Sequence, residues 1–449
     1  MIKLACIIIL LLPIVTFGQD DRVLTFSDAV EIALENNISL KQTQNELKAN
    51  QMQKYSSLAD MAPRIWLRGV VRRTDGNSFN QQEGRVVNGV LDFADGSLEA
   101  QMPLFDGFNR LNAYKQSNAQ VESQAYAIKR TQQDVIRDVA NQYLQCLLDQ
   151  EFLAINEQNL ATQQRQLEQL AGQVEAGSMA KVDQINQEFQ VKNAELLVLR
   201  AKITLRNDKA ALSEVLQIDP SSSFEVATPN LNVNSIDIVN YELEELYAIA
   251  ADNRSDLLQT QKLESVSKFA LKSSRGAYLP TVSAFFSYGS AYNQLVGTPD
   301  SVARDFRQQF FTDNLARTFG LSIRVPIFEG LGARNQVVRA RVNYQNATLN
   351  TQNLDLTVKS DVLRAHQGFQ DAMLNYQASQ AQLDAASLSF SLQKESFELG
   401  ASDFVAYTLA NRDYLNAQST FAQAKYTLMF QEVLLKYAIG TLNFDELPK

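Results

Sequence analysis

Met102-Pro103-Leu104-Phe105-Asp106-Gly107 recurs as Val325-Pro326-Ile327-Phe328-Glu329-Gly330, at a shift of 223 positions (326 − 103 = 223). Val174-Glu175-Ala176-Gly177 recurs as Phe397-Glu398-Leu399-Gly400 at the same shift (400 − 177 = 223). About a hundred residues therefore repeat without a net insertion in either copy. Loops tolerate insertions, whereas packed helices that must end at a fixed place do not. The constant spacing predicts an internal duplication built on long helices.

A long helix is expected after the motif in each copy. Between Asn109 and Ala176 there is no proline and only one glycine, and apolar residues recur at spacings of three and four. At 1.5 Å per residue this stretch reaches about 100 Å. The chain then turns at Gly177-Ser178-Met179 and returns through a second apolar seam: Val182, Ile185, Phe189, Leu196, Leu199 and Ile203. The pattern predicts an antiparallel helical hairpin.

The return helix needs a second helix to match the length of its partner. Over Lys181–Leu216 it is only about 54 Å long, and a further helical stretch over Leu246–Arg275 supplies about 45 Å more. In the second copy, Ser27–Asp60 and Asp403–Ile439 are expected to pair against Ala333–Leu399 in the same way. The sequence thus predicts two sets of stacked helices.

Segments with a period of two lie between the helices. One alternates Leu98, Ala100, Met102 and Leu104 with polar residues or proline, and the other does the same with Leu321, Ile323, Val325 and Ile327. Strands with one aliphatic face and Glu99 or Arg324 on the other fit a wall between lipid and a water-filled lumen. A half-buried antiparallel sheet of a soluble protein gives the same pattern, and only an export signal favours the membrane.

Prolines bound the two expected strand pairs, 63–105 and 280–328, and are predicted to mark the rim where strands become helices. The polar segments 75–92 and 289–314 are expected to be long extracellular loops. Because a spanning barrel needs at least about eight strands, four strands per chain predict several chains, and three would give twelve. Near the rim, an aromatic girdle is expected from Trp66, Phe285, Phe286 and Tyr288.

The N-terminus has the features of a secretory signal. Lys3 precedes an apolar run that is too short to span a membrane, and small residues end at Gly18, so the mature chain is expected to start near Gln19. Cys6 leaves with the signal, and Cys146, among leucines, is predicted to be a small buried hydrophobe. Loss of Lys3 moves the formal net charge from −9 to −10, which argues against nucleic acid as a partner.

These observations divide the chain into five parts. Residues 1–18 form the signal peptide, 19–218 the first repeat with its hairpin over 108–217, and 219–245 a linker. Residues 246–440 form the second repeat with its hairpin over 331–440, and 441–449 a C-terminal tail.

The residues together resemble the TolC-like outer membrane efflux proteins over essentially all of the mature chain. Leu24-Thr25-Phe26-Ser27-Asp28-Ala29-Val30, followed by Ala33-Leu34-Glu35-Asn36-Asn37, is similar to the N-terminal signature of that family, with Thr25 and Asp28 placed as a capping box. The two proline-to-glycine motifs and the two glycine-containing hairpin tips are similar too. Each feature alone is a weak indication of the family, whereas two copies of each, in the same order, are a specific one.

The resemblance implies a mixed α and β membrane protein and a homotrimer. Its 12-stranded transmembrane β-barrel, with four strands per chain, would continue into a long periplasmic α-helical barrel. It implies the exit channel of a tripartite export system in the outer membrane, with a periplasmic adaptor and an inner-membrane pump as partners and no cofactor. The tips, at Gly177, Ser178, Gly400 and Ala401, would dock the adaptor and form the entrance.

The entrance residues depart in part from those of many relatives. An acidic residue six positions after the turn glycine is present as Asp183 in the first copy, whereas the second copy has Ala406, so Asp403 is the substitute candidate. The positions of a polar latch in some relatives are Phe397 and Ser402 here, which puts the latch in doubt. Glycine at the tips also suits a left-handed residue that simply ends a helix.

Two other function classes explain fewer of these features. The sequence does not favour an enzyme. His366, the single histidine, lies in a polar stretch where a solvated surface residue is expected, and no Cys and His cluster has the spacing of metal ligands. A periplasmic adaptor or helical scaffold is also exported and carries a helical hairpin. It would not explain why the hairpin occurs twice, each time after a strand pair. The sequence does not identify the transported substrate.

Overall fold

The computed structural model describes residues 22–80, 84–221, 224–228, 242–297 and 305–443. The predicted signal peptide, 1–18, lies outside these residues, as do most of the predicted linker and the end of the C-terminal tail. Among the described residues, no helix is both long and apolar enough to cross a membrane.

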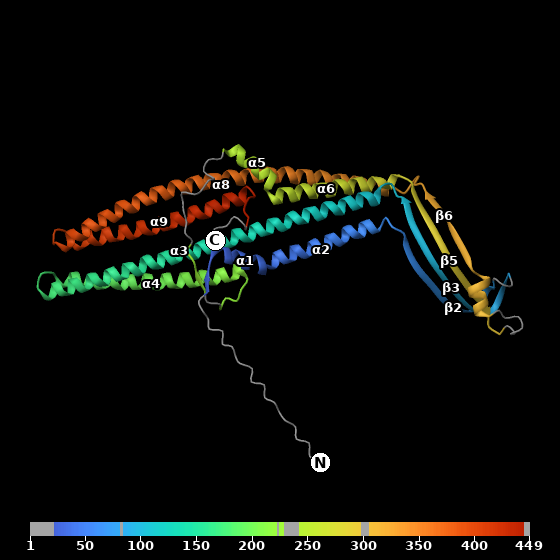
Figure 1. Ribbon diagram of the computed structural model, residues 1–449, viewed down its shortest axis with the longest axis horizontal. Coiled ribbons are helices and arrows are strands. Elements are labelled where there is room, and N and C mark those ends of the chain that lie inside the picture. Colours follow the sequence, from blue (N-terminus) through green and yellow to red (C-terminus); the bar gives the residue numbers. More distant parts are fainter. Residues whose placement is uncertain (1–21, 81–83, 222–223, 229–241, 298–304, 444–449) are drawn as a thin grey trace, which may run out of the picture. The chain divides into compact units, whose positions relative to one another are not determined.

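The two long hairpins repeat the same bounds at the predicted shift. Helix α3 (Asn109–Glu175) and helix α8 (Gly332–Glu398) each have 67 residues. Helix α4 (Lys181–Leu216) and helix α9 (Phe404–Ala438) return antiparallel to them (Figure 1). At 1.5 Å per residue, α3 and α8 are each about 100 Å long. The predicted duplication and its helical hairpins are therefore confirmed.

The shorter helices are each divided where a single helix was expected. The first is α1 (Phe26–Asn36) followed by α2 (Ile38–Ala59), and the other is α5 (Leu243–Asn253) followed by α6 (Ser255–Arg275). Asn37 explains the first break, because its backbone is non-helical and its Oδ1 accepts from the Leu40 N–H at 2.8 Å. The predicted capping box of α1 is present at Thr25 and Asp28.

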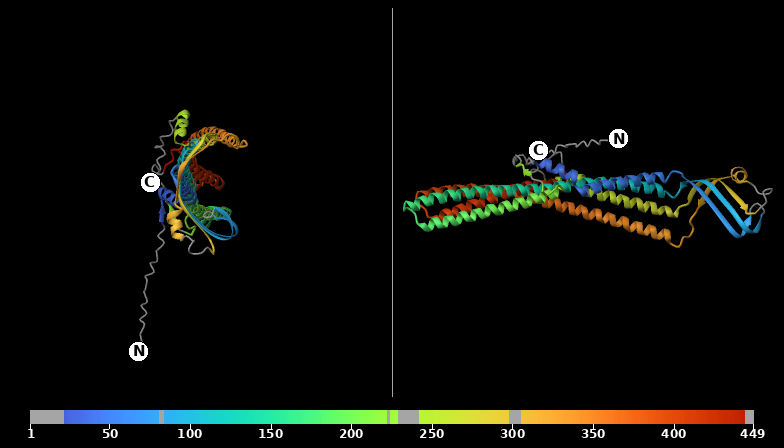
Figure 2. Two further views of the ribbon diagram at one scale, coloured as in Figure 1. Left: turned by 90° about the vertical axis from the view of Figure 1, so that its right-hand side faces the viewer. Right: turned by 90° about the horizontal axis from the view of Figure 1, so that it is seen from below.

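Four antiparallel strands form one sheet in the order β2-β3-β5-β6, and Figure 2 shows them side by side. Their bounds are Arg64–Asn80, Arg85–Phe105, Thr281–Leu295 and Ala316–Arg324. Strand β6 ends before Pro326, although the alternation in the sequence continues to Ile327. Proline has no N–H for a ladder, which fits this early end.

Both predicted extracellular loops are shorter than expected. Residues 75–80 and 85–92 belong to β2 and β3, with Gly76 paired to Gly89, so this prediction was wrong. Strand β5 continues to Leu295, and the second segment then contains the short helix α7 (Phe306–Gln308) and a π-helical turn, η4 (Gln309–Asp313).

The chain separates into two compact units, each of which takes segments from both repeats. One unit contains residues 1–41, 131–253 and 359–449, and the other contains residues 42–130 and 254–358. The second unit carries the four-stranded sheet with α6 and most of α2, whereas the first carries both hairpin tips. Each unit therefore contains parts of both repeats, and neither unit is one complete repeat.

The main apolar core of the first unit surrounds two short parallel strands, β1 (Arg22–Leu24) and β4 (Phe224–Val226). The Tyr143 hydroxyl donates toward the backbone oxygens of Leu24 at 3.0 Å and Ala227 at 2.7 Å. Cys146 is fully buried in the same core, as predicted, and burial raises the pKa of its thiol to about 12. The thiol is therefore protonated and unreactive at neutral pH.

Candidate functional site

Both hairpin tips begin with the same backbone geometry. Gly177 and Gly400 have φ values of +75° and +72°, and in each copy the glycine and the next residue donate back to the helix. The Gly177 N–H donates to Val174 O at 3.0 Å, and the Ser178 N–H donates to Gln173 O at 2.9 Å. These two bonds are a Schellman motif, and Gly400 and Ala401 form it again. A β carbon on either glycine would meet no atom within 4 Å, so the tips are sterically open.

The two acidic entrance candidates have different local roles. Asp403 is the N-cap of α9, where its Oδ1 accepts from the Ala406 N–H at 2.8 Å. Asp183 lies in the first turn of α4, whose N-cap, Ala180, has no side-chain bond. The carboxylate of Asp403 therefore caps α9, whereas that of Asp183 does not cap α4.

An aromatic cluster lies close to the tips and joins the two hairpins. Phe397 and Tyr407 of the second hairpin are buried together with Leu170 of the first, and Met179, Phe390 and Phe404 pack around them. The Phe397 and Tyr407 rings are stacked with centroids 5.2 Å apart. From the sequence, Phe397 belongs to the repeated tip motif and replaces a residue of a polar latch. The structure shows it as part of an apolar contact between hairpins.

A row of buried amide side chains crosses the same helices. Gln187 Nε2 of α4 donates to Gln163 Oε1 of α3 at 2.8 Å, and Gln163 Nε2 donates to Asn159 Oδ1 at 3.2 Å. Asn411 of α9 donates to the same Asn159 oxygen at 3.4 Å. Sequence reasoning missed this row, because Gln and Asn on a helix are usually solvent-facing. The available signal was their position between apolar seam residues.

The strand register divides the sheet into two chemically different faces. Leu98 is paired with Leu67 and with Tyr288, so these three side chains lie on one face. Glu99 is paired with Trp66 and Ser287 on the opposite face. Following the register to β6 places Ile323 on the face of Leu98, and Arg324 on the face of Glu99. We call the first the apolar face and the second the polar face.

The apolar face is strongly exposed in the single chain. Leu67, Val71 and Phe319 are each at least 80% exposed. The predicted aromatic girdle does not form as one belt, because Trp66 and Phe285 lie on the polar face, whereas Phe286 and Tyr288 lie on the apolar face. Neighbouring residues of a strand point to opposite sides, so the four side chains cannot line a single surface.

The polar face carries charges of both signs. Arg64, Arg68 and Arg72 follow one another along β2 at every fourth position, and Glu99 accepts from the Ser97 hydroxyl at 3.0 Å. The Arg72 guanidinium lies 4.3 Å from the Phe93 ring centroid. Such a face suits a water-filled lumen better than lipid.

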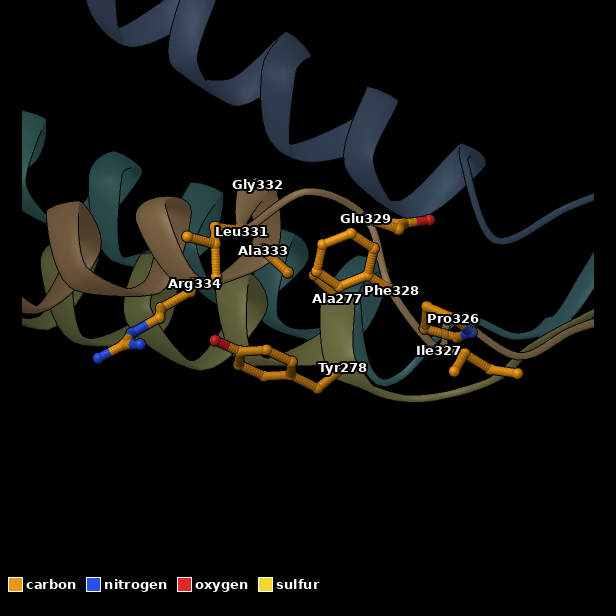
Figure 3. Close-up of a pocket in the computed structure, with 10 residues that line it drawn as sticks. All are labelled: Ala277, Tyr278, Pro326, Ile327, Phe328, Glu329, Leu331, Gly332, Ala333 and Arg334. Atoms are coloured by element: carbon orange, nitrogen blue, oxygen red, sulfur yellow. The ribbon is translucent and has the colours of Figure 1, made fainter.

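The two copies of the motif differ where strands meet helices. In the first copy, a β carbon on Gly107 would lie 2.5 Å from Gly276 O, so the chain before β5 packs tightly against the motif. In the second copy, a β carbon on Gly330 would meet nothing within 4 Å. A shallow apolar pocket is left there (Figure 3), and its Ile327 side chain is 95% exposed.

His366, predicted to be a solvated surface residue, is partly buried, and its Nε2 lies 3.0 Å from Gln370 Nε2. In the described part of the chain, no group of three or more His, Cys, Asp or Glu side chains could hold a metal ion.

Comparisons with known proteins match both repeats. The family described as outer membrane efflux protein matches residues 29–216 and 246–441. The chain is 24% identical over 380 residues to the outer membrane protein TolC of Salmonella enteritidis, which covers 83% of this chain and 72% of that protein.

Solved structures with the same fold include the outer membrane protein VceC of Vibrio cholerae, with a TM-score of 0.79 at 14% identity. That match covers 92% of this chain and 96% of VceC. The CmeC outer membrane channel of Campylobacter jejuni has a TM-score of 0.78 at 17% identity, covering 93% of this chain and 85% of CmeC. At these identities the structures show a shared fold.

Proposed function

The chain belongs to the outer membrane efflux protein family, and from this premise we propose that three copies close into one channel. Family membership makes the chain an outer-membrane protein and the exit channel of a tripartite export system. The proposal adds the homotrimer, the residues that close it, and docking of the hairpin tips to a periplasmic adaptor fed by an inner-membrane pump. The alternative of an adaptor or scaffold leaves the four-stranded sheet unexplained.

The sheet supports closure by several copies. In the part of the chain that the structure describes, β2 and β6 each have only one neighbouring strand. Open edges are unstable in lipid, because unpaired backbone groups have no water to bind. Four strands are too few for a spanning barrel, whereas three copies supply about twelve and leave no edge.

The helices beside the sheet show how a second copy would fit. Helix α3 has a partner on each side: Ser117 lies 2.8 Å from Ser57 of α2, and Glu122 forms an ion pair with Lys262 of α6 at 2.6 Å. Helix α8 contacts α6 through Thr348, which donates to Glu264 at 2.9 Å. No second helix covers the other side of α8 among the described residues of the sheet-containing unit.

The exposed side of α8 is the main support for this arrangement of copies. Ala119 of α3 is 5% exposed, whereas Val342, at the same position of the repeat, is 45% exposed and larger. Large apolar residues also remain exposed on α2, where Met52 is 68% exposed. Because α3 is covered on this side by a helix of the other repeat, we expect α2 of the next copy to cover α8.

The open pocket at the rim has a matching occupant. Ser56-Ser57 and Pro63 recur as Ser273-Ser274 and Pro280, a shift of 217 positions (280 − 63 = 217). The turn at Gly276, which packs against the first motif, therefore corresponds to the turn that follows Ala59. We expect this turn of the next copy to occupy the pocket beside Phe328 (Figure 3).

A cysteine crosslink tests the trimer. The ion pair between Glu122 and Lys262 corresponds, by shifts of 223 and 217, to Gln345 of one copy and Asn45 of the next. In a Cys146→Ser background, the double variant Asn45→Cys with Gln345→Cys should form disulfide-linked trimers on mild oxidation. The readout is the mass of the oxidised protein under denaturing conditions.

Each single variant is the control, because neither can link a ring of three. A pair placed on the covered side, Glu122→Cys with Lys262→Cys, should crosslink within one chain and leave the mass of a monomer. Monomers from both pairs would exclude the arrangement proposed for α2 and α8.

The tips are proposed as the adaptor contact and entrance. Gly177, Ser178, Gly400 and Ala401 are supported by their open backbone geometry, and Asp183 by its position in the first turn of α4. Glu99 and Arg324 are proposed to line the lumen, since they share the polar face. A threefold ring of carboxylates at a narrow entrance would concentrate cations.

A further inference from the structure

An aromatic helical turn connects β5 to β6 at the end of the sheet that is farther from the helices α2, α3 and α6. It consists of α7 and the π-helical turn η4, and three phenylalanines lie on it. The Phe306 and Phe310 rings stack with centroids 5.2 Å apart, and Phe311 meets Phe310 edge-on at 5.3 Å. Tyr292 of β5 extends the cluster, 5.1 Å from Phe306.

This turn is fixed to the sheet by polar contacts as well as by its rings. Strand β6 stops at the pair Ala316 and Gly289, so β5 continues beyond it with one open side. There Asn314 Nδ2 donates to Ala291 O at 2.6 Å, and the Asn293 N–H donates to Gln309 Oε1 at 3.3 Å. The turn therefore supplies partners for strand groups that β6 leaves uncovered.

The turn lies on the apolar face. A β carbon on Gly96 would lie 2.9 Å from Phe310 Cζ, and Gly96 points to the same side as Leu98. The absence of a side chain at Gly96 thus makes room for a ring. Phe306 and Phe311 remain 42% and 62% exposed.

The apolar face has a defined outer limit at this level. Along β3, it extends from Leu104 to Ala94, and the next residue on that side is Asp92, which pairs with Arg73 at 2.6 Å. Ten steps of about 3.3 Å, tilted by about 45°, give a height of roughly 23 Å. The apolar band of outer-membrane barrels is about 25 Å tall. Phe310 therefore lies close to the outer border of the band.

We propose that the turn is a membrane anchor, in which Phe306 and Phe311 insert into the outer leaflet at the boundary between acyl chains and headgroups. The partner is the lipid surface itself, because the exposed rings continue the face that meets lipid. The exposed charges Asp305, Arg307 and Asp313 lie on the same turn and do not give it a strong net charge, so insertion of apolar surface supplies the binding. This inference rests on the proposed orientation of the apolar face toward lipid.

Fluorescence quenching in vesicles tests the anchor. Trp66 is the single tryptophan, so Phe311→Trp in a Trp66→Phe background gives one reporter. The trimer is reconstituted in phosphatidylcholine vesicles brominated either near the headgroup or near the chain ends. Because interfacial side chains lie about 5–10 Å deep, bromines near the headgroup should quench roughly twofold more than deep ones.

Two controls separate this inference from the proposed function. Phe319→Trp lies on the apolar face and should be quenched by lipid, whereas Thr318→Trp lies on the polar face and should not. Quenching at 319 without quenching at 311 overturns the anchor alone. Absence of quenching at both positions refutes the orientation of the sheet, and with it the proposed channel.

A second copy of the chain is the competing occupant. If it covered the turn, the reporter at 311 would be protected from both brominated lipid and aqueous acrylamide, and the anchor would be excluded. Should the Trp66→Phe background fail to fold, a nitroxide on Phe311→Cys in Cys146→Ser protein gives the same test. Collisions with oxygen should then exceed those with a water-soluble nickel chelate.

Discussion

At the scale of single residues, Gly400 has a conformational requirement and a predicted docking role, which one substitution alone does not separate. Its φ of +72° strains any residue with a β carbon, by about 1–2 kcal/mol. Gly84 is a matched control, because its φ is +65° and a β carbon there also meets nothing within 4 Å. It lies in the β2–β3 hairpin, in the unit that does not contain the tips.

Gly400→Leu should therefore abolish export and adaptor crosslinking, whereas Gly84→Leu, with similar strain, should leave both unchanged. Trimers should still reach the outer membrane in both variants, since the added side chains project into open space. Crosslinking to the adaptor in intact cells is the measurement. Normal export by the Gly400 variant would refute docking at this tip.

The two entrance carboxylates are expected to respond differently to loss of charge. Asp183→Asn should lower the cation preference of the purified channel in planar bilayers, because it removes a ring of negative charge. Asp403→Asn keeps a good N-cap residue, so α9 should keep its stability, whereas Asp403→Ala should cost about 1 kcal/mol.

The measurements are the reversal potential under a salt gradient and the midpoint of thermal unfolding. An unchanged reversal potential in the Asp183 variant would remove this residue from the entrance and leave Asp403 as the next candidate.

Asp149 makes stability depend on pH. It is 4% exposed on α3, and burial, together with the neighbouring carboxyl of Asp208 on α4, raises its pKa to about 7. Lys209, which follows Asp208 on α4, pairs with Glu225 at 2.9 Å. The folded state therefore binds a proton that the unfolded state releases near pH 4. The contribution of Asp149 to stability is therefore fully present below about pH 4 and is lost as the pH rises from there through about 7.

Asp149→Asn should accordingly flatten this dependence, since it removes the titrating group while keeping its shape. Thermal unfolding followed by circular dichroism at pH 5.5, 7 and 8.5 measures it. Asp384→Asn, which replaces an exposed carboxylate on α8, is the control and should retain the wild-type dependence. A wild-type midpoint that rises with pH over this range would contradict the assignment.

At the scale of elements, the helices could be predicted from the sequence more accurately than the loops. The 67-residue helices contain no proline, and their ends are fixed by glycines whose left-handed conformation recurs at Gly177 and Gly400. Asp75-Gly76-Asn77 has the composition of a turn, yet it pairs with β3. Pairing with a neighbouring strand overrides local turn preference, and a single sequence does not reveal the neighbour.

The contacts between the hairpins could not be predicted from the hydrophobic periodicity of the sequence either. Gln163 and Asn159 have side chains that usually face water, so their burial depends on a partner helix that only the fold supplies. The turn at residues 306–313 was hidden for a different reason. Its polar neighbours suggested a loop, and Phe310 packs on the sheet only because Gly96 leaves room for its ring on β3.

At the scale of the whole molecule, one chain leaves several surfaces uncovered that a second copy would cover. The sheet has open edges at β2 and β6, and Val342 is exposed where its counterpart Ala119 is buried. The proposed closure by copies could be argued from the sequence, because the number of strands in each chain could be counted there. The identity of the contacting side chains required the register and the burial of the first repeat as a template.

Labelling of single cysteines shows which face of the sheet meets lipid and which meets water. In Cys146→Ser protein, Leu98→Cys and Ile323→Cys lie on the apolar face, whereas Glu99→Cys and Arg324→Cys lie on the polar face. A membrane-impermeant thiol reagent added to reconstituted trimers should label positions 99 and 324 through the lumen. It should leave 98 and 323 to lipid-soluble reagents. Labelling of 98 and 323 by the impermeant reagent, with 99 and 324 protected, would contradict the account.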